Sequence, residues 1–94
     1  MLRLVTIDLS SATDLASFDI YEAAVLSRLP EYGGRLETRL RTLDDAIEVH
    51  VLTFPDAAAY ERFRADPVRA QMRTHWDRSG ARLLSSVEAQ SLLG

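Results

Sequence analysis

Two neighbouring stretches of the chain predict a β-hairpin, and this hairpin limits the possible folds more than any other feature. Residues 35–42 (RLETRLRT) alternate strictly, and residues 46–54 (AIEVHVLTF) are rich in β-branched side chains, as strands are. The sequence LDDA between them, residues 43–46, has the composition of a turn. We therefore expect two antiparallel strands joined at this turn.

The register of the hairpin divides its side chains between two faces. Closure at the turn places Leu40 opposite Val49 and Thr38 opposite Val51, and with Leu36 these residues make one face almost wholly apolar. The other face is predicted to carry Arg35, Glu37, Arg39 and Arg41 against Phe54, Leu52, His50 and Glu48, respectively. Arg39 is thus expected directly across from His50.

The rest of the chain predicts two helices and two further strands. Residues 2–9 and 81–88 have the composition of strands, and residues 14–29 carry apolar residues at helical spacing. A second helical pattern covers residues 56–79, with a break at Asp66-Pro67, where a capping residue precedes a proline. The positions expected on the inner faces of these helices are Leu15, Phe18, Tyr21, Val25, Leu26, Leu29, Ala59, Tyr60, Phe63, Val68, Met72, His75, Trp76 and Ser79.

The order of these elements is β-α-β-β-α-β, which is the order of the α+β ferredoxin-like plait. That fold is an antiparallel four-stranded sheet with both helices on one face. We expect one such domain over residues 1–94, and a chain this short buries only roughly 60–65% of its unfolded surface. Because helices can cover only one face, the apolar face of the hairpin is predicted to pack on a second copy, forming a homodimeric α+β barrel.

Composition excludes several classes of function. Cysteine is absent, which removes disulfides, thiolate nucleophiles and thiolate metal sites. The two histidines do not have the spacing of a metal site, and the net charge of −3 argues against binding to nucleic acid or anionic lipid. No apolar run reaches the roughly 20 residues of a membrane span, and the first residues lack the apolar segment of a signal peptide. We therefore expect a cytoplasmic protein that binds neither nucleic acid nor membrane.

Three short motifs resemble those of the dimeric α+β barrel superfamily, which includes antibiotic-biosynthesis monooxygenase-like proteins and small domains of unknown function. They are Tyr32-Gly33-Gly34-Arg35, Phe54-Pro55-Asp56 with Tyr60 and Phe63, and Asp66-Pro67. The resemblance spans essentially the whole chain and implies a ligand cavity between the sheet and the helices of each subunit. It also implies a small aromatic or polyketide-like ligand from secondary metabolism, and an enzyme of the cofactor-independent oxygenase, cyclase or isomerase type.

Haem-degrading relatives in that superfamily place a tryptophan on the second helix and an axial histidine further along. The matching positions of this chain hold Phe63 and Met72, with His75 one turn beyond. The resemblance therefore implies no haem, and we expect the protein to use no cofactor.

His50 and Arg39 are the candidate catalytic residues. A histidine titrates near neutrality, so His50 can act as general base or acid on an acidic C–H or O–H of a ligand, a role worth about 10²–10⁴ in rate. Arg39 can hold a carboxylate, enolate or phenolate of the same ligand. The alternative is that the charged residues of this face form cross-strand ion pairs with His50 packed among them, in a non-catalytic binding or accessory domain.

Further candidate ligand contacts are aromatic, apolar or basic side chains on the strands and helices. They are Tyr21, Arg35, Phe54, Tyr60, Phe63, Met72, His75 and Trp76. A tryptophan can stack on a flat aromatic ligand, and the tyrosines can direct hydroxyl groups toward it. The alternative is that the tryptophan is a core or dimer contact and that each tyrosine is a packing residue. RNA binding, which the same fold serves elsewhere, is not expected because residues 2–9 contain no aromatic side chain.

Overall fold

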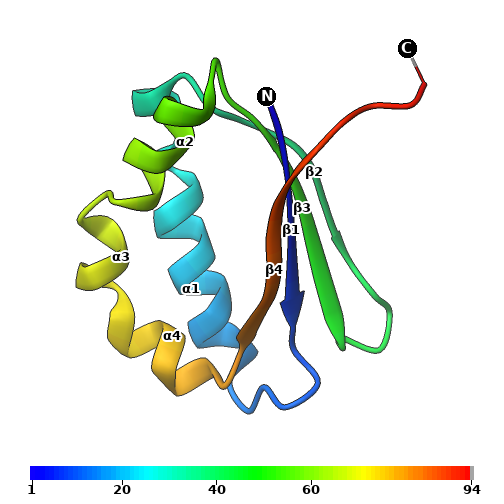
Figure 1. The fold of residues 1–94 in the computed structure, drawn as a ribbon. Helices are drawn as coiled ribbons and strands as arrows, with labels where there is room; N and C mark the ends of the chain where they lie inside the picture. The colour runs from blue at the N-terminus through cyan, green and yellow to red at the C-terminus, as the bar shows by residue number, and fades with distance from the viewer. Residues whose placement is uncertain (94) are drawn as a thin grey trace.

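A computed structural model describes residues 1–93 of the chain. Its strands are β1 (Leu2–Asp8), β2 (Arg35–Arg41), β3 (Ile47–Thr53) and β4 (Arg82–Ala89). They form one antiparallel sheet in the order β2-β3-β1-β4. All helices of the described chain lie on one face of this sheet, and the opposite face is bare (Figure 1). The predicted ferredoxin-like plait is confirmed.

The first helix, α1 (Leu15–Leu26), begins as predicted and ends early. Asp14 caps it by accepting a hydrogen bond from a backbone N–H of the first turn. The helix was expected to continue to Leu29, but that residue instead begins a 3₁₀ helix, η1 (Leu29–Tyr32). Pro30 explains the difference, because it has no N–H to donate and its ring would clash with the carbonyl four residues earlier.

The second helical pattern is divided into three helices. They are α2 (Ala57–Arg64), α3 (Val68–Gln71) and α4 (Arg73–Ser79). Asp56 caps α2, and Oδ1 of Asp66 accepts a hydrogen bond from the backbone N–H of Val68 at the start of α3, so the predicted break before Pro67 is confirmed. A further break at Met72 was not predicted, and Gly80 ends α4 in the left-handed conformation, with φ of 77°. No helix within residues 1–93 is long and apolar enough to cross a membrane.

The pairing of β2 with β3 confirms one part of the predicted register and corrects the other. Arg39 pairs with His50, as expected. The pairs Thr38–Val51, Leu40–Val49 and Arg41–Glu48 also have the predicted register. Beyond them a β-bulge between Leu36 and Thr38 leaves Glu37 as an extra residue. The pairs there are Arg35–Thr53 and Leu36–Leu52, in place of the predicted Arg35–Phe54 and Glu37–Leu52. Leu36 was predicted on the apolar outer face, but the bulge instead pairs it with the core residue Leu52.

The core lies between the sheet and the helices, and the opposite face of the sheet remains apolar and exposed. Rings of Phe18, Phe54 and Phe63 are buried on the helix side. On the outer face Leu4 pairs with Val51 on one side and Val87 on the other. The central strands thus carry apolar side chains on both faces, while helices cover only one (Figure 1).

Candidate functional site

Two adjoining cavities lie between the sheet and the helices. The larger has a volume of about 380 Å³ and the smaller about 260 Å³. We call them the Arg3 cavity and the His50 cavity, after a residue that lines only one of them. The residues that line both are Val5, Leu52, Phe63, Arg69 and Leu83. The two cavities therefore adjoin each other along these five residues.

The His50 cavity has mostly apolar and aromatic walls. Tyr21 and Glu22 reach it from α1 and Trp76 reaches it from α4. His50 reaches it from β3, where burial alternates along the strand so that every second residue faces the helices. Trp76 packs against Tyr21 with ring centroids 5.1 Å apart, so two aromatic faces meet beside the cavity.

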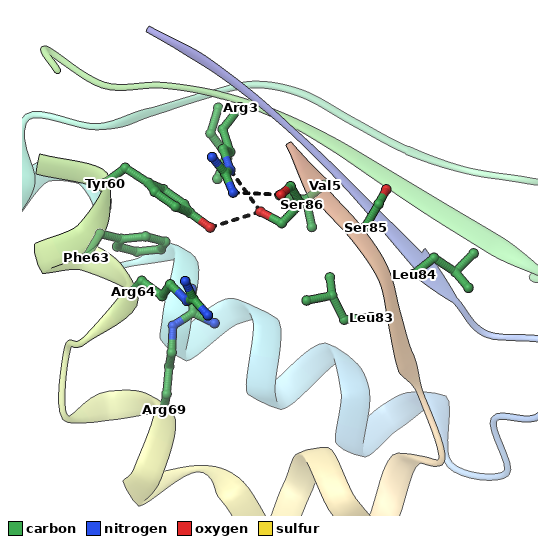
Figure 2. Close-up of a pocket in the computed structure, with 11 residues that line it drawn as sticks. Arg3, Val5, Tyr60, Phe63, Arg64, Arg69, Leu83, Leu84, Ser85 and Ser86 are labelled. Atoms are coloured by element: carbon green, nitrogen blue, oxygen red, sulfur yellow. Dashed lines mark hydrogen bonds between the residues drawn. The ribbon is translucent and has the colours of Figure 1, made fainter. Parts of the chain in front are cut away.

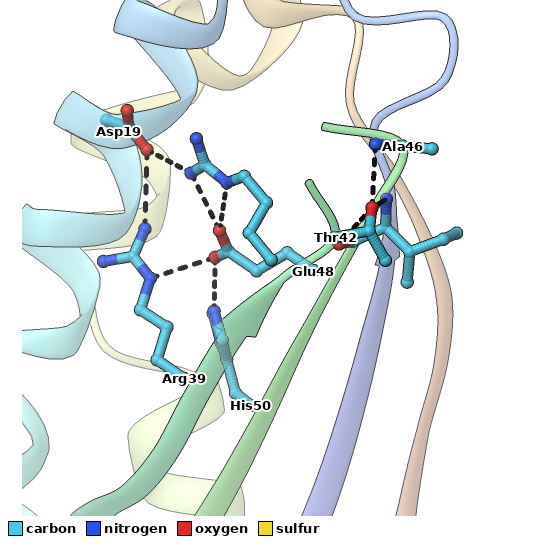
Figure 3. A network of polar contacts seen from close by, with 8 residues as sticks. Asp19, Arg39, Thr42, Ala46, Glu48 and His50 are labelled. Atoms are coloured by element: carbon cyan, nitrogen blue, oxygen red, sulfur yellow. Dashed lines mark hydrogen bonds and ion pairs between the residues drawn. The ribbon is translucent and has the colours of Figure 1, made fainter. Parts of the chain in front are cut away.

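A buried carboxylate, that of Glu48, holds His50 in place (Figure 3). Glu48 is only 1% exposed, and its Oε2 lies 2.6 Å from Nε2 of His50. Arg39 Nε donates to the same oxygen at 3.1 Å, and Arg41 Nε donates to Oε1 at 2.8 Å. Both guanidinium groups also contact Asp19 on α1, so the network ties the hairpin to the helix.

This network determines which nitrogen of His50 is available for chemistry. Burial by itself would raise the pKa of Glu48, but hydrogen bonds from His50 and Arg41 and the charge of Arg39 lower it to about 2. An ionised carboxylate only accepts hydrogen bonds, so Nε2 of His50 must be the donor. Within residues 1–93 this is the only hydrogen bond of the His50 ring. The neutral imidazole therefore keeps a lone pair on Nδ1 with no partner in the described chain.

Glu22 is a functional candidate that the sequence analysis missed. Its side chain lines the His50 cavity and the residue is 6% exposed. Burial raises the pKa of Glu22, and the electrostatic effect of the His50 side chain opposes this rise. A signal was present in the sequence, because Glu22 lies four residues after Phe18 and three before Val25, within the apolar stripe of α1.

Arg3 and Arg69 were missed as well, although each has a comparable signal. Arg3 alternates with Val5 and Ile7 along β1, and all three point to the helix side of the sheet. Arg69 lies three residues before Met72, on the predicted inner stripe of the second helical segment. A charged residue in a position that should face the core is the pattern they share with Glu22.

Four of the predicted aromatic contacts line the cavities. Tyr21 and Trp76 line the His50 cavity, Tyr60 lines the Arg3 cavity, and Phe63 lines both. Within residues 1–93 no group of three or more His, Cys, Asp or Glu side chains is placed to hold a metal ion. The cavity walls present aromatic rings and polar side chains.

The other predicted site residues do not line either cavity. The guanidinium of Arg39 is engaged with Glu48 and Asp19. Arg35 is largely exposed on β2, Phe54 and Met72 pack in the core, and Nδ1 of His75 is buried without a hydrogen-bond partner among the described residues. His50 thus lines the cavity, whereas Arg39 lies outside it and contacts the carboxylate of Glu48, which orients His50.

No protein-family model and no curated protein matches the chain, whereas several solved structures do. One is SnoaB, a cofactor-independent oxygenase from Streptomyces nogalater, with a TM-score of 0.72 and 21% identity over 98% of this chain and 94% of that one. A proposed antibiotic biosynthesis monooxygenase from Nitrosomonas europaea has a TM-score of 0.71 at 10% identity, covering 98% and 99% of the two chains. Rv0793 from Mycobacterium tuberculosis has a TM-score of 0.71 at 8% identity, covering 99% and 98%. The likeness extends over whole chains and shows a shared fold.

Proposed function

We propose that the protein binds a small aromatic or polyketide-like metabolite in the His50 cavity and acts on it without a cofactor. The observation that carries this proposal is the cavity of about 260 Å³, in which His50 and Glu22 stand among aromatic and apolar walls. Pockets of that kind, with few polar groups in an apolar lining, bind small organic molecules. The shared fold with SnoaB, a cofactor-independent oxygenase, supports the same class of chemistry.

In this proposal His50 is the general base. Glu48 accepts a hydrogen bond from the Nε2–H of His50 and orients the ring, which leaves Nδ1 to take a proton from an acidic C–H or O–H of the ligand. The resulting carbanion or phenolate is electron-rich and can react with O₂ in an oxygenase, or close or rearrange a ring in a cyclase or isomerase. Arg39 acts through Glu48, as a positioning residue that keeps the carboxylate ionised.

The test compares His50→Ala with His75→Ala, since His75 is the other histidine and lines neither cavity. An anthrone such as dithranol serves as the substrate probe, because its ring C–H is acidic, and O₂ uptake is measured with an oxygen electrode. We expect His50→Ala to lower the rate by about 10²–10⁴ and His75→Ala to leave it unchanged. A folded His50→Ala protein with full turnover would remove His50 from the mechanism.

One observation favours a second candidate, a non-catalytic binding domain. The polar face of the hairpin is ion-paired, because Arg39 and Arg41 both contact Glu48. This domain would bind the same class of ligand in the His50 cavity, with His50 as a structural member of the network. Ligand binding without O₂ uptake or any other conversion of the probe would favour it.

We also propose that the protein is a homodimer joined through the bare face of its sheet, and that it works in the cytoplasm. Leu40 and Val87 on that face are 63% and 49% exposed. A Leu40→Lys substitution should give a monomer by light scattering at micromolar concentration, because it places a charge in the apolar interface. Leu43→Lys, in the fully exposed turn, is the matched control and should leave the dimer intact. A monomeric unmodified protein would contradict the proposed assembly.

A further inference from the structure

We infer that the ligand carries an oxyanion head group, and that the Arg3 cavity binds this group while the rest of the ligand lies in the His50 cavity. The inference rests on the proposed function, because it specifies the ligand of that same space. It is carried by three arginines, Arg3, Arg64 and Arg69, that come from three different elements and reach one cavity (Figure 2).

The charges in the Arg3 cavity are unbalanced. Its 11 lining residues include Arg3 from β1, Arg64 from α2 and Arg69 from α3, and none of the 11 is acidic. Arg64 has one distant, exposed ion pair with Glu61, at 3.9 Å. Neither Arg3 nor Arg69 forms an ion pair with any residue of the described chain. A partly enclosed site with several guanidinium groups and no carboxylate is suited to an anion.

Arg69 lies at the junction, because it lines both cavities. Its guanidinium carbon is 5.0 Å from the centroid of the Phe63 ring, and its Nε is buried without a hydrogen-bond partner among residues 1–93. Buried N–H donors in folded proteins are rarely left unpaired, so this nitrogen needs an acceptor that residues 1–93 do not supply. The nearby acid Glu22 lines the His50 cavity together with Arg69, but burial raises the pKa of Glu22 and so disfavours the charged form that would neutralise Arg69.

Arg3 is fixed in position by neutral partners. Its Nε donates to Oγ of Ser86 at 3.0 Å and its NH2 nitrogen donates to the Ser86 carbonyl at 2.6 Å. The guanidinium also stacks on the Tyr60 ring, with its carbon 4.1 Å from the centroid, and the Tyr60 hydroxyl is 2.9 Å from Oγ of Ser86 (Figure 2). These contacts orient the cation without cancelling its charge, which is the arrangement that favours recognition of a carboxylate or phosphate.

The residues common to both cavities set the orientation of the ligand. An anion between Arg3 and Arg69 has Val5, Phe63 and Leu83 next to it and the His50 cavity beyond. An aromatic ring attached to that anion would therefore extend toward Trp76 and the base. The ligand class is accordingly an aromatic or polyketide-like acid rather than a neutral ring system.

The test compares 2-naphthoate with 2-naphthamide, which has the same ring system and no charge. Binding near neutral pH is followed through the fluorescence of Trp76, the single tryptophan of the chain, and by calorimetry. We expect the unmodified protein to bind naphthoate at least about tenfold more tightly than the amide, the difference that one charge-assisted hydrogen bond provides. 2-Naphthyl phosphate, run in parallel, shows whether a carboxylate or a phosphate is preferred, and tighter binding of either anion than of the amide supports the inference.

Arg69→Gln should weaken naphthoate binding by about tenfold or more and leave amide binding unchanged. Arg62→Gln, an exposed residue of α2 outside both cavities, is the matched control for the change in net charge. Equal affinity of the unmodified protein for naphthoate and amide would overturn this inference while leaving the proposed function standing. Failure to bind any of the three probes would overturn both. The comparison of probes on the unmodified protein holds even if Arg69→Gln does not fold.

Discussion

Replacing Glu48 with glutamine should destabilise the protein by an amount that depends on pH in a specific way. The pKa of Glu48 is lowered from 4.5 to about 2, because hydrogen bonds from His50 and Arg41 and the charge of Arg39 outweigh the effect of burial. At about 1.4 kcal/mol per pKa unit, this corresponds to roughly 3 kcal/mol of the free energy of unfolding. Since Glu48 is 1% exposed, solvent screens its interactions with His50, Arg39 and Arg41 only weakly.

The sign follows from linkage. A carboxyl group with a lowered pKa binds protons more weakly in the folded state, so its stabilisation is complete above pH 4.5 and is lost as the pH falls toward about 2. Glu48→Gln should therefore be roughly 3 kcal/mol less stable than the unmodified protein at neutral pH. That difference should shrink toward zero in acid, because the unmodified protein loses the same contribution there.

The assay is urea unfolding followed by circular dichroism, at equal protein concentration, over a series of pH values. Glu61→Gln is the matched control, because Glu61 is 64% exposed and its ion pair with Arg64 is 3.9 Å long. Such a surface pair contributes less than about 1 kcal/mol. A Glu48→Gln difference that is absent at neutral pH, or that stays constant through the acid range, would refute the electrostatic account of the network.

Three further substitutions test other parts of the structure. Glu22→Gln should raise stability at neutral pH and leave it unchanged in acid, because burial raises the pKa of Glu22 and the folded state disfavours its ionised form; urea titrations at both pH values measure this. Gly80→Ala should cost about 1–3 kcal/mol in thermal unfolding, since φ is +77° and a Cβ there would lie 2.9 Å from the Ser11 carbonyl oxygen. Tyr32→Phe should cost roughly 1–3 kcal/mol at neutral pH and less in acid, because the Tyr32 hydroxyl donates to Asp66, whose pKa that bond lowers.

Local patterns were sufficient to predict the order and type of the elements. Strand periodicity placed Arg39 across from His50, and the helical patterns expected from residues 14 and 56 begin one residue later, directly after the capping residues Asp14 and Asp56. These features depend on φ, ψ and hydrogen bonds within a few residues, so the sequence nearby contains the information. The bulge at Glu37 and the break at Met72 lack such a signature, and neither was predicted.

The cavities depend on residues that are distant along the chain. Arg3 meets Ser86 because β1 and β4 are neighbours in the sheet, and Arg69 reaches the same space from α3, in the helical layer that packs over the sheet (Figure 1). The ion pairs that the sequence suggested for Arg39 are present, but whether His50 also borders a void depended on how far α1 and α4 stand from the sheet. Periodicity determines the side to which a side chain points, because direction is a property of the local backbone. What that side chain meets is decided by the packing of elements that the chain brings together from far apart.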